Sequence, residues 1–358
     1  MHNSYNLKKS FKNKKVLITG HTGFKGSWLA FLLYEMGADV MGFALPPVTD
    51  INHFDLLGLS KKIKHIEGDI HDAKLLAKTV GDFEPEFVFH MAAQALVRSS
   101  YDDPVNTFST NIMGSVNLLD AVRKCASVRS LVYITSDKCY ENVEWIWGYR
   151  ENDLLGGHDP YSSSKAAAEL VFSSYTRSFF HDRTTLGAAT VRAGNVIGGG
   201  DWAVDRIIPD CIRAIEADKP ISIRNPNATR PWQHVLEPLS GYLLLASRLY
   251  EEPNRWKGSW NFGPSTNEVC TVQKVAEVII EHLGKGEIEI SNSPGQLHEA
   301  RLLQLNCDKA HQLLEWYPRW NSEKTLQATA LWYKTLMNGG EAEKITRKQI
   351  YEFFPELI

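Results

Sequence analysis

Short apolar, β-rich runs alternate along the first half of the chain with segments whose apolar residues recur at helical spacing. The helical pattern is clear at 27–36 and 105–122, where apolar positions fall about three or four residues apart. Strands separated by helices predict an α/β fold with a doubly wound parallel sheet, covered by helices on both faces. The runs expected to form strands are residues 14–20, 38–45, 86–93, 130–137 and 187–196.

The pattern changes after about residue 195. Three glycines at 198–200 come first, and a helix is expected at 239–250. Turn-forming residues at this density predict a smaller, irregular domain over residues 196–358, laid over the carboxyl edge of the sheet of a first domain at 14–195. The second part of the chain is free to cross back to the first. The prolines that interrupt it are Pro209, Pro220, Pro226, Pro231 and Pro238.

Composition narrows the class of protein. The 358 residues, 43% hydrophobic and 23% charged, can bury a large core and exceed one minimal domain. Lysine and arginine number 39 against 42 aspartate and glutamate, a net charge of -3 without a basic stripe, so nucleic-acid binding is not predicted. Residues 1–15 are polar and no later run approaches a membrane span, so we expect a cytoplasmic protein with no membrane contact.

The five cysteines include no C-x-x-C pair, which argues against a disulfide framework and against a structural zinc site. We expect buried thiols in a reducing compartment and no bound metal. They stand at Cys125, Cys139, Cys211, Cys270 and Cys307.

Three glycines follow the first predicted strand. Gly20, Gly23 and Gly26 form G-x-x-G-x-x-G between a strand that ends at Thr19 and a helix that starts near Ser27. Such glycines let the backbone turn tightly and approach a pyrophosphate, which the N-terminus of the helix then favours. An ordinary turn is the alternative, but the position between first strand and first helix predicts a dinucleotide site in a Rossmann-like fold.

Five polar residues form a candidate catalytic group. Tyr161 and Lys165 stand one turn apart on one face of a predicted helix, so that the lysine ammonium is expected to lower the tyrosine pKa from about 10. Ser136, Asp137 and Lys138 stand at the end of the strand predicted at 130–137, at the sheet edge where such folds bind ligands. Taken singly, Y-x-x-x-K is better explained by a surface tyrosine and a solvated lysine. In this order along the chain, with the glycine loop and Ser136, the residues indicate catalysis.

The glycine spacing and these motifs together resemble the extended short-chain dehydrogenase/reductase family, the NAD-dependent epimerases and dehydratases. The resemblance implies NAD as cofactor. One usual feature is absent: the second strand ends GFAL, without the acidic residue that binds the ribose of NAD, so NAD over NADP depends on the resemblance alone. The cofactor-binding residues it implies are Gly20, Thr22, Gly23, Phe24, Lys25, Gly26, Asp69, Ile70, Ala92, Ala93, Gln94, Asn111, Tyr161 and Lys165.

Longer strings are similar to the CDP-glucose branch of the nucleotide-sugar 4,6-dehydratases. This resemblance implies oxidation of CDP-glucose at carbon 4, loss of water across carbons 5 and 6, and return of hydride to carbon 6. By it, Ser136 and Tyr161 bind the reacting hydroxyl, Asp137 is the acid and Lys138 the base. That role needs the neutral form of Lys138, and an ion pair with phosphate or carboxylate is its alternative. The strings cover residues 20–29, 134–142, 144–152, 191–203 and 230–246.

The same resemblance implies which residues bind the substrate. Asn195 contacts it, Arg230 meets the diphosphate and His234 lies near it. For Arg206 and Arg301, as for Arg224, a solvated surface role is an equal alternative.

Two other functions stay open, a nucleotide-sugar 4-epimerase and a non-catalytic NAD-binding regulator. The Asp137–Lys138 pair disfavours the first, and the presence of Tyr161, Lys165 and Ser136 disfavours the second. We expect a homodimer or homotetramer, since helices such as 105–122 and 162–180 often pair between subunits in this family.

Overall fold

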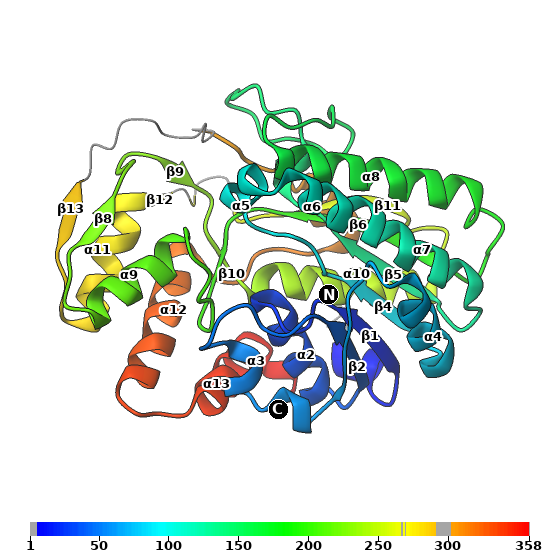
Figure 1. Cartoon of the computed structure of the whole chain (residues 1–358), viewed down its shortest axis with the longest axis horizontal. Coiled ribbons are helices and arrows are strands. Elements are labelled where there is room, and N and C mark those ends of the chain that lie inside the picture. The colour runs from blue at the N-terminus through cyan, green and yellow to red at the C-terminus, as the bar shows by residue number, and fades with distance from the viewer. Residues whose placement is uncertain (1–5, 266–267, 269, 291–301, 358) are drawn as a thin grey trace.

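A seven-stranded parallel sheet forms the centre of the computed structural model, which describes residues 6–265, 268, 270–290 and 302–357 (Figure 1). The strand order is β11-β6-β5-β4-β1-β2-β3, and every neighbouring pair is parallel. The predicted doubly wound fold is therefore confirmed. The strands are β1 (Lys15–Thr19), β2 (Asp39–Ala44), β3 (Lys64–Glu67), β4 (Phe87–His90), β5 (Ser130–Ile134), β6 (Gly187–Ala193) and β11 (Gly258–Phe262).

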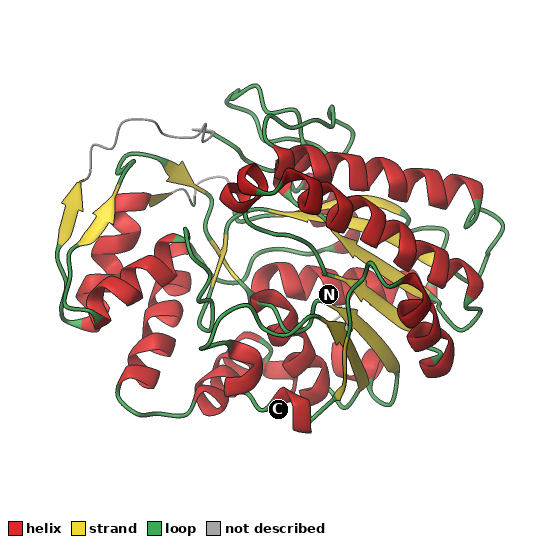
Figure 2. Cartoon of the chain, in the orientation of Figure 1, coloured by secondary structure: helices red, strands yellow, loops and turns green. Residues whose placement is uncertain are grey.

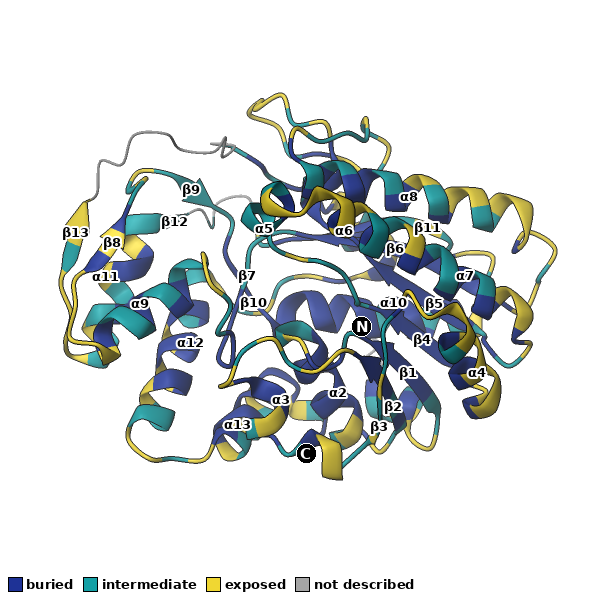
Figure 3. Cartoon of the chain, viewed as in Figure 1, coloured by how far each residue is buried: buried dark blue, intermediate teal, exposed yellow. Residues whose placement is uncertain are grey.

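Helices cover both faces of this sheet because side chains along each strand alternate between two cores. In β1, Leu17 joins one core, whereas Val16 and Ile18 join the other. The strands are accordingly buried on both sides, and the outer faces of the helices are exposed (Figure 3). The Leu17 face packs under α4 (Ala73–Phe83), α7 (Ser115–Lys124) and α8 (Pro160–Ser178), and the other under α1 (Leu7–Phe11), α2 (Phe24–Glu35) and α10 (Leu236–Glu251).

The second part of the chain does not separate cleanly at residue 196. Strand β11 extends the sheet beside β6, and α10 packs against β5 and β6, so the chain crosses back after its first excursion. The remaining elements form the lobe on the left of Figures 1 and 2 and the helices below it. They are β7 (Val196–Ile197), α9 (Ile207–Glu216), β8 (Ile221–Ile223), β9 (Thr229–Arg230), β10 (Gln233–His234), β12 (Cys270–Thr271), α11 (Val272–Leu283), β13 (Ile288–Ile290), α12 (Ser322–Met337) and α13 (Ala342–Phe353).

One predicted element differs from the structure, and some observed strands were not predicted. The continuous helix expected at 105–122 is interrupted by a π-helical turn at Ser109–Gly114 between α6 (Pro104–Phe108) and α7. Strand β3 was not predicted, because its four residues are only partly buried and carry little apolar pattern. Among the described helices none is long and apolar enough to cross a membrane. Short helices are α3 (His53–Leu56) and α5 (Val97–Asp102), with 3₁₀ turns at Leu59–Lys61, Asp137–Cys139 and Pro355–Leu357.

Candidate active site

At each of the three glycines in the loop after β1, a side chain would have a different physical consequence. Gly20 has a φ of +77°, and a Cβ there would lie 2.7 Å from the backbone nitrogen of Ala92. A Cβ on Gly26 would lie 2.1 Å from the Gly20 oxygen. Gly23 is different: it is exposed, and its Cβ would make only an ordinary contact of 3.5 Å within the protein. Two glycines thus close the turn, and the third keeps its outer surface open to a ligand.

The geometry of this loop fits a bound dinucleotide. Gly23 is the N-cap of α2 and no side chain caps the helix, which leaves the amides of the first turn available to an anion. The Thr22 hydroxyl donates to the Leu45 carbonyl at 2.9 Å and so ties the loop to the end of β2. Beyond β3, Asp69 is partly exposed and Ile70 is buried against Gly114, where an added Cβ would lie 2.4 Å away.

Asn111 joins the exit of β4 to the catalytic helix α8. Its Nδ2 donates to the Gln94 carbonyl at 3.0 Å and to the Ser164 hydroxyl at 2.8 Å, and its Oδ1 accepts from the Gln94 amide at 2.9 Å. It lies in the π-helical turn, a geometry frequent at functional sites. The bonds fix the loop that follows Ala92 and Ala93 against α8.

Ser136 and Asp137 begin a 3₁₀ turn directly after β5. The Ser136 hydroxyl donates to Asp137 Oδ1 at 3.0 Å and accepts from the Lys138 amide at 3.3 Å. Burial raises the pKa of Asp137, against the charge of Lys138 and the Ser136 hydrogen bond. The carboxyl can therefore keep its proton at a pH where an exposed aspartate has lost it. Among the described residues, Lys138 has no side-chain partner within hydrogen-bonding distance, although its charge acts on Asp137.

Tyr161 and Lys165 lie on the first turns of α8, which Asp159 caps by accepting from the Ser162 amide at 2.9 Å. The prediction that the tyrosine pKa is lowered is wrong for this structure. Burial raises the pKa of Tyr161 to about 12, and a hydrogen bond with Ser136 only partly opposes it. Burial lowers the pKa of Lys165 to about 8, where an ammonium can lose its proton near neutrality.

Lys25 reaches the catalytic residues rather than only the cofactor loop. Loss of solvent and then the charge of Arg206 lower the pKa of Lys25 to about 8, whereas the carboxyl of Asp137 raises it. Its charge also lowers the pKa of Lys165. The charges of Lys25 and Lys138 therefore both act on the buried carboxyl of Asp137.

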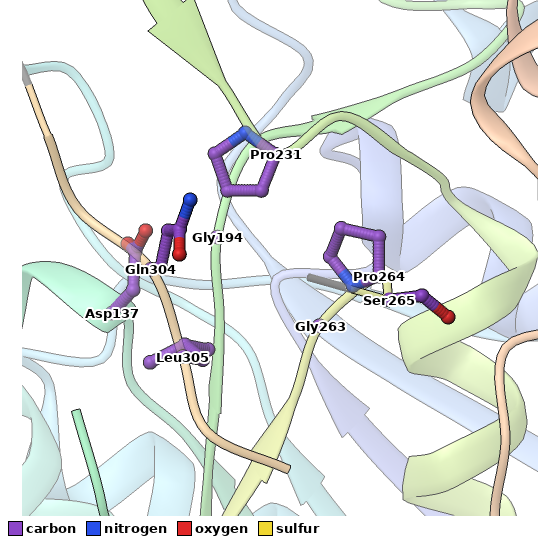
Figure 4. Close-up of a pocket in the computed structure, with 8 residues that line it drawn as sticks. All are labelled: Asp137, Gly194, Pro231, Gly263, Pro264, Ser265, Gln304 and Leu305. Carbon is purple, nitrogen blue, oxygen red and sulfur yellow. The ribbon is translucent and has the colours of Figure 1, made fainter. Parts of the chain in front are cut away.

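A pocket opens from Asp137 toward the second part of the chain (Figure 4). Gly194 forms part of its wall, and a Cβ there would lie 2.6 Å from Asp137 Oδ2. The absence of a side chain at Gly194 is thus what gives the carboxyl its place. The pocket is lined by Asp137, Gly194, Pro231, Gly263, Pro264, Ser265, Gln304 and Leu305.

Three of the residues expected to bind substrate lie at or beside this region. Arg206 donates to Asp201 at 2.8 Å, and its charge opposes the rise in the pKa of Tyr161. Asn195 follows Gly194, and Arg230 precedes Pro231, so both adjoin the pocket wall. Arg224 is instead 3.8 Å from Asp205.

His234, predicted to lie near the substrate, packs in the core in this structure. Its side chain is 0% exposed, with ring centroids 4.8 Å from Trp320 and 5.7 Å from Trp28. Its Nδ1 accepts from the Leu236 amide at 3.3 Å, so it packs in the core beneath the site. Arg301, also predicted to bind substrate, lies outside the described residues.

Sequence comparison identifies relatives over almost the whole chain. A sequence profile of the family described as GDP-mannose 4,6 dehydratase matches residues 17–329. The chain is 46% identical to the CDP-glucose 4,6-dehydratase of Salmonella typhimurium over 350 residues, which are 97% of this chain and 98% of the relative. The chain belongs to the GDP-mannose 4,6-dehydratase family. The predicted membership of the nucleotide-sugar 4,6-dehydratases is confirmed.

Solved structures of this type have the same fold. The chain is similar to a UDP-glucose 4-epimerase of Thermotoga maritima, crystallised with UDP-glucose, with a TM-score of 0.77 and 22% identity over 90% of this chain and 99% of that one. It is also similar to a dTDP-glucose 4,6-dehydratase of Bacillus anthracis in complex with NAD, with a TM-score of 0.74 and 23% identity over 91% and 98% of the two chains. These likenesses confirm the family fold.

Sequence reasoning missed several residues of this family member's site. Gln304 and the segment 263–265 reach the pocket from far along the chain, and no local motif marks them. The electrostatic interaction of Lys25 with Asp137 and Lys165 was missed because the loop motif suggested only a cofactor role. The buried Glu169–Arg192 pair beneath the site was also missed, although its two members stand on segments already predicted as helix and strand.

Proposed function

We propose that the protein is an NAD-dependent CDP-glucose 4,6-dehydratase, which converts CDP-D-glucose to CDP-4-keto-6-deoxy-D-glucose and water. The observation that carries the proposal is the buried Asp137 hydrogen-bonded to Ser136, with the same serine also lowering the pKa of the buried Tyr161. A residue pair for oxidation and an acid for elimination therefore share one hydroxyl. The 46% identical relative with the same name supports the choice of substrate.

Ser136 and Tyr161 act on the hydroxyl at carbon 4. Ser136 hydrogen-bonds this hydroxyl, and the phenolic oxygen of Tyr161 removes its proton as the carbon is oxidised. Lys165 favours the phenolate by its positive charge. Because burial raises the pKa of Tyr161, further positive charge is needed, and Arg206 supplies some of it.

Asp137 and Lys138 carry out the loss of water. Oxidation at carbon 4 acidifies the hydrogen at carbon 5, which Lys138 removes as the base. Asp137, protonated because burial raises its pKa, donates its proton to the departing hydroxyl at carbon 6. Gly194 leaves Asp137 the space to face the pocket from which the hydroxyl is presented.

The loop after β1 and the first turn of α2 would hold NAD. Gly20, Gly23 and Gly26 give the backbone its close turn, and the uncapped amides of α2 would bind the pyrophosphate. Bound there, NAD supplies the hydride acceptor for carbon 4 and the hydride donor for carbon 6. Asp69 and Ile70 lie where the adenosine end is expected, and Asn111 fixes the loop of Ala92, Ala93 and Gln94.

Arg230 and Asn195 would bind the substrate diphosphate and sugar beside the pocket, with Arg206 at the catalytic end. The planar fork of an arginine donates two parallel hydrogen bonds to phosphate oxygens, which suits this task. Arg206 is held by Asp201, itself buried, so its guanidinium is oriented before substrate arrives.

The protein would act as a homodimer or a homotetramer in the cytoplasm. Apolar side chains lie exposed along α6, the π-helical turn and α8, where two subunits could pair through helices. Val105 is 79% exposed, Met113 52% and Leu170 62%, unusual values for apolar residues on neighbouring helices. Sedimentation velocity of the purified protein, with and without Leu170→Glu, would measure the assembly.

A direct assay tests the proposed function. The purified protein is incubated with NAD and one nucleotide sugar at a time: CDP-glucose, dTDP-glucose or UDP-glucose. The masses of the products are then measured by mass spectrometry. We expect loss of one water from CDP-glucose. Water loss only from dTDP-glucose or UDP-glucose would assign the protein a different dehydratase substrate. Conversion of a nucleotide sugar without water loss would favour an epimerase.

A further inference from the structure

A fully buried ion pair joins the catalytic helix to the sheet. Glu169 on α8 and Arg192 on β6 have side chains only 3% and 2% exposed. Arg192 Nε donates to Glu169 Oε1 at 2.8 Å, and Nη2 donates to Oε2 at 2.9 Å, so the pair is bidentate. Burial alone would raise the pKa of Glu169, but Arg192 and the hydroxyls of Thr135 and Thr190 together lower it, so the carboxylate stays charged.

Hydroxyl groups of three strands complete the carboxylate's shell. Thr135, directly after β5, donates to Glu169 Oε1 at 2.5 Å. Thr190 on β6 donates to Oε2 at 2.8 Å, and Ser259 on β11 lies 3.4 Å from the same oxygen. One side chain of α8 therefore contacts the residue that follows β5 and the neighbouring strands β6 and β11.

Arg192 extends the network to the far end of the catalytic turn. Its Nη1 donates to the Tyr140 hydroxyl at 2.7 Å and to the Glu151 carbonyl at 3.0 Å. The Tyr140 hydroxyl in turn donates to Asn261 Oδ1 at 2.8 Å. The network thus contacts the chain directly before Ser136, through Thr135, and directly after the 3₁₀ turn, through Tyr140.

Stability alone does not explain so polar a core. Taking two charges out of water costs several kcal/mol, and buried pairs are often replaceable by apolar residues at no loss of stability. What the pair adds is geometry, since a bidentate carboxylate–guanidinium contact tolerates little displacement. Glu169 lies one turn beyond Lys165 on the same face of α8, so a shift of its carboxylate moves the helix that carries Lys165 and Tyr161.

We propose that Glu169 and Arg192 are positioning residues that hold Tyr161 and Lys165 of α8 in register with Ser136 and Asp137 after β5. Neither residue touches the substrate; both act through the elements they join. The inference rests on the proposed dehydratase function, because a rate is its first measure.

The first test compares Glu169→Gln with the wild type in the CDP-glucose assay. The amide keeps an acceptor for Thr135 or Thr190 but loses the charge that orients Arg192. We expect kcat to fall about 10- to 100-fold while KM changes less than about threefold, as a displacement near 1 Å of catalytic groups would cause. An unchanged kcat in a folded variant would overturn the proposal.

The pH profile gives a readout that a purely structural role would not move. The ionisable groups that shift the pKa of Lys165 are Lys25 on α2, Glu169 on α8 and Cys139 in the 3₁₀ turn. Lys165 in turn lowers the pKa of His90 on β4. The negative charge of Glu169 raises the pKa of Lys165, so removing that charge lowers the pKa of Lys165 further. In Glu169→Gln the alkaline fall in kcat should shift to lower pH.

A double variant covers the case in which Glu169→Gln fails to fold. Glu169→Leu with Arg192→Met removes both charges, and we expect its melting temperature near that of the wild type but a kcat as low as that of the single variant. Recovery of wild-type kcat in this stable core would overturn the proposal. The control is Glu35→Gln, which breaks a remote bidentate pair with Arg347 at 3.0 and 3.1 Å and should leave kcat and its pH profile unchanged.

A crystal structure of the double variant separates this inference from the proposed function. We expect the separation of Ser136 Oγ and Tyr161 Oη to change by about 0.5 Å or more relative to wild-type crystals. An unchanged separation would overturn the positioning role whatever the substrate is. A wild-type protein without water loss from CDP-glucose would overturn only the proposed function.

Discussion

The hydroxyl of Ser136 donates a hydrogen bond to Asp137 Oδ1 at 3.0 Å. Ser136 also opposes the rise in the pKa of Tyr161, so one serine acts on both the base for oxidation and the acid for elimination. This contact orients the carboxyl toward the pocket that Gly194 leaves open. The residues for oxidation at carbon 4 and for loss of water therefore lie side by side, but a substitution can impair either step without the other.

Replacement of Asp137 by asparagine should separate them. The amide keeps the acceptor for Ser136 but cannot donate a proton to the hydroxyl leaving carbon 6. We expect water loss to slow by about 10²- to 10⁴-fold. Oxidation at carbon 4 should continue, so the near-ultraviolet absorbance of reduced nicotinamide should build up on mixing with CDP-glucose. Slow product formation without that absorbance would place the defect in oxidation instead.

Two lysines can be distinguished as the base at carbon 5. With Lys138 as the base, Lys138→Met should slow the exchange of the carbon 5 hydrogen with deuterated water by about 10²-fold or more. Lys25→Met should leave exchange much less affected, and should instead raise the pKa of Lys165, which Lys25 lowers. Nuclear magnetic resonance of the product measures the exchange. Loss of exchange in Lys25→Met alone would reverse the assignment.

The loop glycines differ in what an added methyl group would meet. Gly26→Ala sets a Cβ 2.1 Å from a backbone oxygen and should destabilise the protein by about 1–3 kcal/mol. Gly23→Ala fits the protein, at a φ of -75°, and should fold normally but bind NAD about tenfold or more weakly. Thermal denaturation and calorimetric titration with NAD measure the two effects.

The matched control for the glycine pair is Gly81→Ala in α4, where an added Cβ meets nothing within 4 Å. It should leave NAD affinity unchanged. Wild-type affinity in Gly23→Ala would mean that no ligand approaches this loop closely.

The rate should fall as pH rises through about 8. Burial lowers the pKa of Lys165 from 10.5 to about 8, so its ammonium loses a proton in this range and no longer favours the Tyr161 phenolate. A profile of kcat against pH measures the midpoint. Lys165→Arg keeps its charge at high pH, so whatever activity remains should lose this alkaline fall. A fall that persists at the same midpoint would assign it to another group, with Lys25 the first candidate.

The sheet and its ligand-binding edge could be predicted from the sequence because parallel, doubly buried strands leave long apolar runs. Strand β11 could not be assigned in this way, because its pairing with β6 depends on a chain that returns after more than sixty residues. The edge strand β3 is half solvated and so lacks the pattern. Local pattern thus gives the elements, whereas their distant pairing depends on tertiary packing.

The candidate site divides in the same manner. Tyr161, Lys165 and Ser136 could be predicted because short motifs on defined elements mark them. The burial of His234 could not be predicted, because the sequence of a short strand does not show whether a histidine in it faces the core or the pocket. The pKa of Tyr161 was predicted in the wrong direction because burial, which no motif reports, outweighs the neighbouring charges.

The central claim is tested most directly with CDP-glucose that carries deuterium at carbon 4. The proposed sequence of oxidation, water loss and hydride return moves this deuterium to carbon 6 of the same sugar. We predict a CDP-4-keto-6-deoxy-glucose with deuterium in its methyl group, detected by nuclear magnetic resonance. Deuterium retained at carbon 4 of an epimerised sugar, or no conversion with NAD bound, would contradict the account.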